Sequence, residues 1–216
     1  FRNRLIFPIN NISGNPIAIG GRILEKKDYL AKYINSPETQ FFKKGYNLYN
    51  LDFARKLSNK FDEVYIVEGY MDVIGLSKNG VENVVANLGT ALTKRQMDTI
   101  NQFFSHCIIC FDGDLSGYNA ALRAAENFII TLSPEKKISF LFLPENEDPD
   151  SFIKRNGQKK FLKYSSDTII PIHEFIFQNY KKTVGDDPLS QARFEKKLKQ
   201  ISNSIEDNYV KKYISC

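Results

Sequence analysis

The sequence of 216 residues is poor in cysteine and histidine, with three and two of them, and it contains no long hydrophobic run. No apolar stretch approaches the roughly 18 residues that a membrane-spanning helix needs. The opening residues, Phe1-Arg2-Asn3-Arg4, do not have the pattern of a signal peptide. These absences predict a soluble protein of the cytoplasm with no membrane partner.

The cysteines also bear on metal binding. Cys107 and Cys110 have a spacing found in zinc sites, and His106 lies beside them. Residues three apart in a strand point to opposite faces of the sheet, so the two sulfur atoms can bind one ion only if the strand breaks. We therefore predict buried thiols rather than a metal site or a disulfide framework, and no role for His106 or His173.

Composition and charge are compatible with a folded protein that binds a polyanion. The hydrophobic fraction of 42% excludes general disorder, and the length allows one or two domains. The net charge of +5 permits a nucleic-acid partner without requiring one. Basic side chains are concentrated in the first part of the chain, whereas the acidic clusters come later. The early basic residues are Arg2, Arg4, Arg22, Lys26, Lys27, Lys32, Lys43 and Lys44.

The first 60 residues show a hairpin pattern followed by irregular chain. Apolar runs at 5–9 and 17–24, joined by turn-forming residues at 10–16, predict a β-hairpin. Residues 32–50 have the composition of a long loop, and loops of this length are usually functional or mobile. The apolar spacing over 48–60 predicts a helix.

Strand and helix patterns then alternate, which predicts an α/β fold with a parallel sheet and helices on both faces. Strands are predicted near 63–67, 83–87, 107–111 and 137–143, and helices near 70–78, 93–104 and 116–131. After about Pro149 the chain is Lys-rich and amphipathic, without a strand signal, so a small helical subdomain is expected. Asp186-Asp187-Pro188 provides a helix start within it.

Two acidic clusters directly follow strand-like runs. Glu68 follows the run that ends at Val67, and Asp112 and Asp114 follow Ile108 to Phe111. The carboxyl ends of parallel strands meet at one edge of a sheet, so these side chains should converge there. Like charges about 4 Å apart cost roughly 1 kcal/mol in water and more in a dry cleft, so the cluster needs a cation. Oxygen ligands without His or Cys favour Mg²⁺ or Mn²⁺ over zinc, which predicts chemistry on phosphate.

Each cluster also has a simpler interpretation. Glu68 and Asp72, four residues later, equally well favour a helix N-terminus. Asp112-Gly113-Asp114 could be a plain turn, although on an extended strand exit both aspartates would point the same way and grip one ion. Taken together with Glu68, the metal site is the favoured interpretation.

Two further segments belong to the same predicted edge. Residues 145–150 form a third acidic group, in which Asp148 and Asp150 flank Pro149, and a solvated loop that caps the next helix explains it slightly better than a metal site. Residues 87–93 could offer backbone N–H groups to a phosphate at a helix N-terminus, but Thr93 is equally good as a plain N-cap.

The order Glu-Gly-x-x-Asp after one strand and Asp-x-Asp after a later one resembles the Toprim domain of primases, topoisomerases and some nucleases. Seven segments follow one another along the chain: Phe-Arg-Asn-Arg-Leu-Ile-Phe-Pro-Ile, Gly-Gly-Arg, Lys-Tyr-Ile-Asn-Ser-Pro-Glu-Thr, Val-Glu-Gly-Tyr-Met-Asp-Val-Ile, Leu-Gly-Thr-Ala-Leu-Thr, Phe-Asp-Gly-Asp and Asp-Pro-Asp. In this order they resemble the bacterial DnaG-type primases, which make short RNA primers on single-stranded DNA in the primosome. The resemblance covers residues 1 to about 155.

The resemblance implies two-metal nucleotidyl transfer that depends on Mg²⁺ or Mn²⁺. It assigns catalysis to Glu68, Asp112 and Asp114. It assigns metal binding to Glu68, Asp72, Asp112, Asp114, Asp148 and Asp150, with Asp72 as a supporting acid. It assigns nucleotide and template binding to Arg22, Lys32, Asn35 and Lys44.

The resemblance also implies a domain plan and partners. Residues 61–150 would be the Toprim domain with a mainly parallel sheet, 1–60 part of an α+β basic subdomain, and 151–216 a helical subdomain. The family's zinc-binding domain, the opening part of the polymerase core and the helicase-binding domain are expected outside this sequence, so priming by this fragment alone is not assumed. Expected partners are single-stranded DNA, ribonucleoside triphosphates, an RNA–DNA hybrid and, through the C-terminal domain, the replicative helicase; a monomer is expected.

Three alternatives stay open at this point. A Toprim nuclease would use the same carboxylates on water and would cleave DNA without ribonucleotides. A topoisomerase would need a nucleophilic tyrosine, and nothing singles out one of the 11 tyrosines. A non-catalytic module would bind DNA without metal-dependent chemistry.

Overall fold

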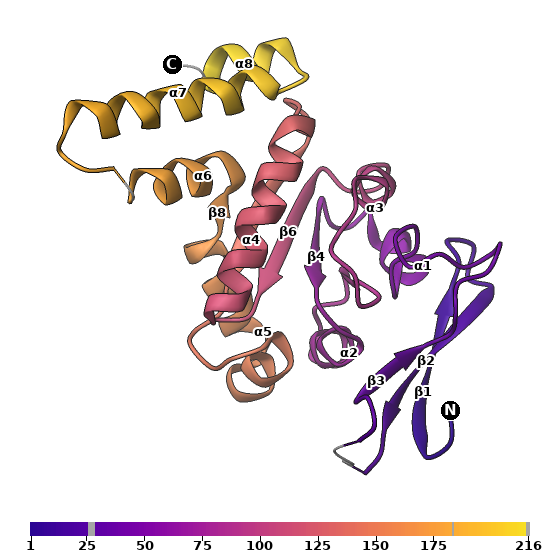
Figure 1. The fold of residues 1–216 in the computed structure, drawn as a ribbon. Coiled ribbons are helices and arrows are strands. Elements are labelled where there is room, and N and C mark those ends of the chain that lie inside the picture. Colours follow the sequence, from indigo (N-terminus) through magenta and orange to yellow (C-terminus); the bar gives the residue numbers. More distant parts are fainter. Residues whose placement is uncertain (26–28, 183, 215–216) are drawn as a thin grey trace.

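The computed structural model describes residues 1–25, 29–182 and 184–214, so two lysines of the early basic block, Lys26 and Lys27, lie outside the described residues. The described chain forms a small antiparallel sheet, a central sheet covered by helices, and a group of helices at the end of the sequence (Figure 1).

The small sheet contains three antiparallel strands in the order β1-β2-β3, and their bounds are β1 (Arg4–Asn10), β2 (Pro16–Ile23) and β3 (Tyr33–Asn35). The predicted hairpin is confirmed. The prediction of irregular chain was wrong at β3, because Tyr33 to Asn35 pair with Arg22 to Gly20 of β2. This pairing brings residues 32–35 beside Arg22.

A tyrosine docks the small sheet onto the rest of the molecule. Tyr70 stacks on Phe7 of β1, with ring centroids 4.8 Å apart, and meets Tyr49 edge-on at 4.7 Å. A Cβ on Gly20 of β2 would lie 2.6 Å from the Tyr70 ring, so only glycine allows this close approach. These contacts hold the basic strands over the end of the central sheet.

The helix expected over 48–60 is much shorter than predicted. Only α1 (Leu51–Ala54) and the 3₁₀ turn η1 (Arg55–Leu57) are helical. Tyr49 instead forms an extended bridge to Ala86, and Asn50 adopts a left-handed conformation with φ of 68°. The apolar spacing marked residues that are buried, but the chain before them is held in an extended contact.

The central sheet has five strands in the order β5-β4-β6-β7-β8, parallel except for β8. In chain order they are β4 (Glu63–Val67), β5 (Val84–Ala86), β6 (His106–Phe111), β7 (Lys137–Phe142) and β8 (Ile170–Pro171). The four predicted strands and the mainly parallel α/β sheet are confirmed. The expectation of no strand after 149 was wrong at β8, because two residues that include a proline show no alternation.

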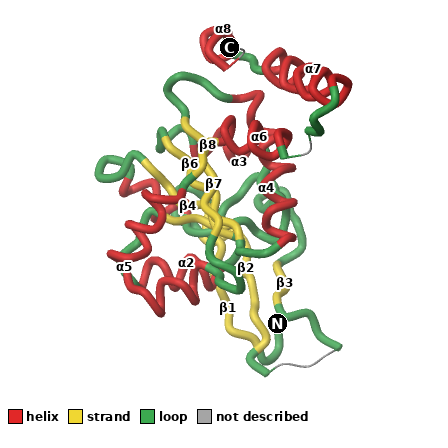
Figure 2. The backbone as a smooth tube through the Cα atoms, turned by 90° about the vertical axis from the view of Figure 1, so that its left-hand side faces the viewer, coloured by secondary structure: helices red, strands yellow, loops and turns green. Residues whose placement is uncertain are grey.

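Helices cover both faces of this sheet, with α2 and α5 on one side and α3 and α4 on the other (Figure 2). Their bounds are α2 (Tyr70–Lys78), α3 (Lys94–Ile100), α4 (Leu115–Phe128), the 3₁₀ turn η2 (Ile129–Thr131) and α5 (Pro149–Thr168). Cys107 packs in the core on the α4 side and Cys110 in the core on the α2 side. Both are buried free thiols, as predicted.

The C-terminal helices are α6 (Ile172–Lys181), α7 (Pro188–Ser204) and α8 (Asn208–Ile214) (Figure 1, orange to yellow). The helix start expected at Asp187 is confirmed, because its carboxylate accepts a hydrogen bond from the Ser190 N–H at 2.9 Å. None of the described helices is both long and apolar enough to cross a bilayer.

A charged cleft at the carboxyl edge of the central sheet

A cleft of about 380 Å³ lies where the carboxyl edge of the central sheet faces the small sheet. One side carries the acidic residues that follow β4, β6 and β7, and the other carries basic and amide side chains of the β2–β3 region. The charged and amide residues that line it are Arg22, Lys32, Asn35, Glu68, Asp72, Asn87, Asp112, Asp148 and Asp150. Most of the predicted site residues are therefore brought together.

Glu68 and Asp112 follow β4 and β6, which are adjacent parallel strands. Partial burial raises the pKa of the Glu68 carboxyl, and the charges of Asp112 and Asp114 raise it further. Burial likewise raises the pKa of Asp112, and Asp148 and Asp114 add to it. The predicted crowding of like charges at this edge is present.

Asp72 links the starts of two helices. Its Oδ2 accepts a hydrogen bond from the Gly69 N–H at 3.1 Å, and the carboxylate also accepts the backbone N–H of Asp150. Burial raises the pKa of Asp72 to about 7, with contributions from Asp148 and Asp112 that outweigh the two N–H groups. Asp72 is thus the most strongly perturbed carboxyl of the cleft.

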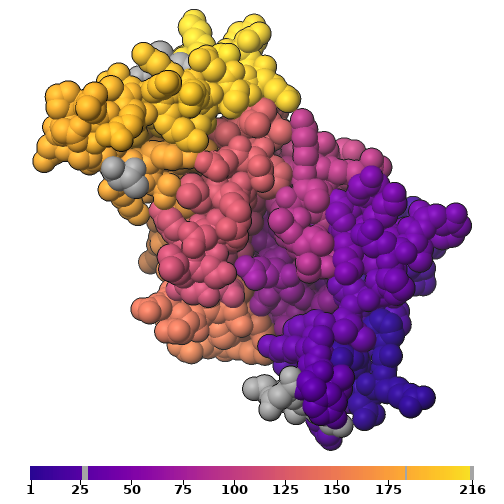
Figure 3. Space-filling view, in the orientation of Figure 1, coloured from indigo at the N-terminus to yellow at the C-terminus, as the bar shows by residue number. Residues whose placement is uncertain are grey.

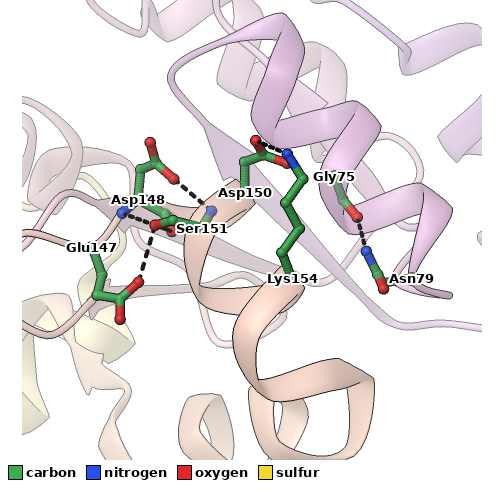
Figure 4. A network of polar contacts seen from close by, with 7 residues as sticks. All are labelled: Gly75, Asn79, Glu147, Asp148, Asp150, Ser151 and Lys154. Atoms are coloured by element: carbon green, nitrogen blue, oxygen red, sulfur yellow. Dashed lines mark hydrogen bonds and ion pairs between the residues drawn. The ribbon is translucent and has the colours of Figure 1, made fainter.

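Asp148 and Asp150 open helix α5 (Figure 4). Asp148 is the N-cap, and its Oδ1 accepts from the Ser151 N–H at 2.7 Å. Asp150 Oδ2 pairs with Lys154 Nζ at 2.6 Å, whereas its Oδ1 is buried and has no hydrogen-bond donor among the described residues. A Cβ on Gly75 of α2 would lie 2.1 Å from that Oδ1, so glycine at this position lets Asp150 approach the helix.

Asp114 is placed differently from the other carboxylates. Its Oδ1 caps α4 by accepting from the Gly117 N–H at 2.7 Å, and it lines a neighbouring hollow rather than the cleft. The extended strand exit was wrong, because the Asp114 N–H donates to the Asp112 carbonyl at 2.8 Å and the chain turns at Gly113. Asp114 still acts on the cleft through its charge.

The basic side of the cleft surrounds a tyrosine. The Arg22 guanidinium and Lys32 Nζ lie 5.9 Å and 5.7 Å from the centroid of the Tyr33 ring. Asn35 is held at both ends of its amide, because Oδ1 accepts from the Tyr70 hydroxyl at 2.6 Å and Nδ2 donates to the Leu88 carbonyl at 2.9 Å. The amide is therefore fixed between α2 and the loop after β5.

Lys44 lies outside the cleft lining. Its backbone N–H donates to Glu38 Oε1 at 2.8 Å, and its carbonyl accepts from Gln96 Nε2 at 2.9 Å. Thr93 is the N-cap of α3 and forms a capping box with Gln96. Of the segment 87–93, Asn87 and Gly89 reach the cleft.

Tyr33 and Tyr70 also line the cleft, and sequence reasoning had no role for them. The only signal was that Tyr70 lies within the Glu-Gly-Tyr-Met-Asp segment, two residues after Glu68. Their positions depend on the docking of the small sheet, which no local pattern reveals.

The donor atoms fit a hard divalent cation. As the side chains lie, no three of the described carboxylate, histidine or cysteine residues stand close enough together to hold one ion. The donors are nevertheless all oxygens, the set that Mg²⁺ and Mn²⁺ prefer. The raised pKa values and the unpartnered Oδ1 of Asp150 are both conditions that a bound cation relieves. Side-chain rotation would be needed to bring the oxygens onto one ion.

Comparisons with known proteins agree with this geometry. A family model of the Toprim domain matches residues 62–142, and a model of the DNA primase catalytic core, N-terminal domain, matches residues 1–55. The DNA primase of Pseudomonas aeruginosa is 44% identical over 178 residues, which are 82% of this chain and 26% of the relative. The DNA primase of Clostridium acetobutylicum is 39% identical and covers 98% of this chain and 35% of its own length. The chain thus spans about a quarter to a third of these relatives.

Several solved structures are also similar to this chain. A DNA primase domain from Pseudomonas aeruginosa superposes with a TM-score of 0.92 at 38% identity, covering 99% of this chain and 66% of that one. The Escherichia coli primase catalytic core gives a TM-score of 0.93 at 32% identity, with 99% and 68% covered. A DnaG primase catalytic domain bound to single-stranded DNA gives 0.92 at 32% identity, with the same coverage.

Proposed function

The chain belongs to the family of bacterial DnaG-type DNA primases, and on this basis we propose that it supplies the metal-binding and nucleotide-binding part of a primase catalytic core. The core would join ribonucleotides into short RNA primers on a single-stranded DNA template during replication. The proposal includes Glu68, Asp112 and Asp114 as the catalytic carboxylates.

The observation that carries this proposal is the opposition of charge across one cleft. The acidic side brings together residues that are far apart in the sequence, such as Glu68, Asp112 and Asp148, and the basic side holds Arg22 and Lys32. A nucleoside triphosphate with divalent metal carries both signs of charge. Such a ligand is neutralised from both sides of the cleft, which neither side could achieve alone.

Mg²⁺ or Mn²⁺, when held by these carboxylates, supplies activation of a 3′-hydroxyl and neutralisation of the triphosphate. Arg22 and Lys32 would attract and orient the phosphates. Asn35, with its amide fixed by Tyr70 and Leu88, would present a rigid polar group beside them. The residues proposed to hold the metal are Glu68, Asp72, Asp112, Asp114, Asp148 and Asp150.

The remaining assignments extend this proposal beyond the cleft. Lys44 would contact the template outside it, since its segment lies against the start of α3. The similar DnaG primase catalytic domain that was solved with single-stranded DNA supports the proposal of a single-stranded DNA template. The other proposed partners are ribonucleoside triphosphates, an RNA–DNA hybrid and the replicative helicase. The protein would be monomeric and cytoplasmic, and its domain boundaries would lie at residues 60 and 150.

Calorimetric titration of Mn²⁺ and a ribonucleoside triphosphate tests the site. We expect saturable, metal-dependent binding that weakens at least tenfold in Asp112→Asn. Asp98→Asn is the matched control, because Asp98 is an exposed acid on α3 outside the cleft. Equal affinity in the wild type and Asp112→Asn would contradict the assignment of the cleft.

A cleavage assay separates the nuclease alternative. The chain is incubated with Mn²⁺ and labelled single-stranded DNA, with and without ribonucleotides. We expect intact DNA in both. Cleavage without ribonucleotides that is lost in Asp112→Asn would favour a Toprim nuclease.

A further inference from the structure

A second hollow, of about 460 Å³, opens between α4 and the central sheet on the other side of Glu68. In Figure 3 the molecule is hollowed between coral α4 and the magenta segments that lie beside it. Its floor is apolar and includes Ile66 and Ile109, and its rim includes Arg123 and Asn127 of α4. Apart from Glu68 and the loop after β5, the residues that line it have no part in the proposed primase chemistry.

The hollow exists because α4 presents alanines to it. Ala120 and Ala124, one turn apart, line the space, whereas Ala121 and Ala125 on the adjacent face are fully buried in the core. Alanine has no atoms beyond Cβ, so the space between α4 and the sheet stays unfilled there. The volume lies in the range of small-molecule pockets, roughly 300–1,000 Å³.

Two of the polar residues that line this space carry groups without partners among the described residues. The Asn87 Oδ1 is buried and has no hydrogen-bond donor among the described residues. A buried acceptor of this kind is stabilised when a ligand supplies an N–H. Arg123 is exposed at the rim and has no ion-pair partner in the described part of the chain.

The hollow and the charged cleft share a wall. Glu68, Asn87 and Gly89 line both spaces. A ligand that occupies the two together needs an anionic end for the cleft and a flat apolar end with N–H donors for the hollow. A nucleotide has this division between its phosphates and its base.

We infer that the hollow receives the base of a ribonucleotide whose phosphates lie in the charged cleft, an inference that rests on the proposed function. The Asn87 Oδ1 accepts an N–H of the base, Ala120 and Ala124 leave room for the ring, and the Arg123 guanidinium stacks on its outer side.

The test separates the base from the phosphates. Binding of adenosine, guanosine, cytidine and uridine is measured by NMR titration without metal, and binding of inorganic tripolyphosphate with Mn²⁺ by calorimetry. Ala124→Leu fills the hollow. Asn119→Leu places the same side chain on the same helix, at an exposed residue outside the lining.

We expect at least one nucleoside to bind the wild type and the Asn119→Leu control. Ala124→Leu should weaken that binding at least tenfold and leave tripolyphosphate binding unchanged. Absence of nucleoside binding, or equal binding in Ala124→Leu, overturns the inference. Failure of tripolyphosphate to bind with Mn²⁺ instead counts against the proposed function, so the two failures are distinguishable.

Thermal unfolding shows whether Ala124→Leu folds. If it does not, Arg123→Ala at the rim of the hollow provides a second test. Arg123 is exposed, so Arg123→Ala should retain the unfolding temperature of the wild type. We expect it to weaken nucleoside binding about threefold, and an unchanged affinity would contradict the stacking role.

Discussion

The two ends of the central sheet differ in the groups that surround their ionisable side chains. At the amino end, His106 Nε2 lies 3.0 Å from Ser139 Oγ and His106 Nδ1 lies 3.8 Å from Glu63 Oε2, so an imidazole of lowered pKa meets a hydroxyl and a single carboxylate. At the carboxyl end, Asp72 and Asp112 belong to a group of acids that raise one another's pKa. The amino end is arranged for stability, whereas the carboxyl end keeps unfavourable charge that a ligand can relieve.

The close contact between α2 and α5 is where we expect the largest effect on the carboxyl end. Gly75→Ala would normally stabilise a helix by about 1 kcal/mol. Here its Cβ would lie 2.1 Å from Asp150 Oδ1, and overpacking of this kind costs about 1–3 kcal/mol. We expect a net loss of about 1 kcal/mol, and at most about 2 kcal/mol, in the free energy of unfolding, measured with urea, together with weaker Mn²⁺-dependent nucleotide binding.

Two further variants sharpen this prediction. Ser77→Ala changes a partly buried residue of the same helix without the contact to Asp150 and should stay within about 0.5 kcal/mol of the wild type. Gly75→Ala combined with Asp150→Ala should regain most of the stability but not the nucleotide binding. An unaltered stability in Gly75→Ala alone would show that α5 can shift freely.

Asp72 gives the carboxyl end a characteristic pH dependence. Its pKa is raised from 3.8 to about 7 by burial and by Asp148 and Asp112. Below about pH 4 this carboxyl is protonated in both the folded and the unfolded chain and does not affect the free energy of unfolding. Between about pH 4 and about pH 7 the unfolded chain loses the proton while the folded chain keeps it, so stability falls as the pH rises. In metal-free buffer we expect Asp72→Asn to remove this fall and to gain on the order of 1 kcal/mol at pH 8.

Urea unfolding at pH 5 and pH 8 with a chelator measures this difference. Asp98→Asn, on the exposed side of α3 and outside the cleft, is measured in parallel as the control. Parallel pH profiles for the wild type and Asp72→Asn would mean that the carboxyl is well solvated.

The Tyr70 hydroxyl connects stability to the site. Tyr70→Phe removes the 2.6 Å hydrogen bond to Asn35 Oδ1, which should cost about 1 kcal/mol and release the amide beside the proposed phosphates. Tyr65→Phe is the matched control, because it removes a buried 3.1 Å hydrogen bond to Ser165 of α5, and neither residue lines the cleft. We expect similar losses in urea unfolding, but weaker nucleotide binding, by about threefold, only in Tyr70→Phe. Equal affinities would separate Asn35 from the site.

The sequence predicted the parts of the site that depend on strand ends. Apolar runs located β4 and β6, and the geometry of parallel sheets then placed Glu68 beside Asp112. Asp148 was expected at the same edge, but its function came only from the family resemblance. Local patterns are sufficient where a side chain follows directly from the end of its own strand.

The parts that were missed depend on contacts between distant segments. Gly75 and Asp150 are adjacent only because α2 and α5 pack on one face of the sheet, and Gly20 is required only because Tyr70 docks there. The helix predicted over 48–60 was shortened for the same reason, since Tyr49 pairs with Ala86 of β5. Such pairings leave no periodic signal in the residues themselves.

His106 should give the amino end the smallest effect and the opposite pH dependence. Burial, with a contribution from Lys137, lowers its pKa from 6.5. Above pH 6.5 the imidazole is then neutral in both the folded and the unfolded chain. Below pH 6.5 the unfolded chain binds a proton on this ring more readily than the folded chain, so stability falls as the pH decreases. We expect His106→Gln to reduce this fall by less than about 1 kcal/mol between pH 7 and pH 5 in urea unfolding.

Glu63 provides the competing effect that decides this prediction. Its Oε2 lies 3.8 Å from His106 Nδ1, and its negative charge favours the protonated ring. His173→Gln, at the exposed histidine of α6, is measured beside it as the control. If His106→Gln instead makes stability fall more steeply with acid, the ion pair with Glu63 outweighs burial. The amino end would then owe its stability to a charged pair, and its difference from the carboxyl end would lie in the sign of the neighbouring charges alone.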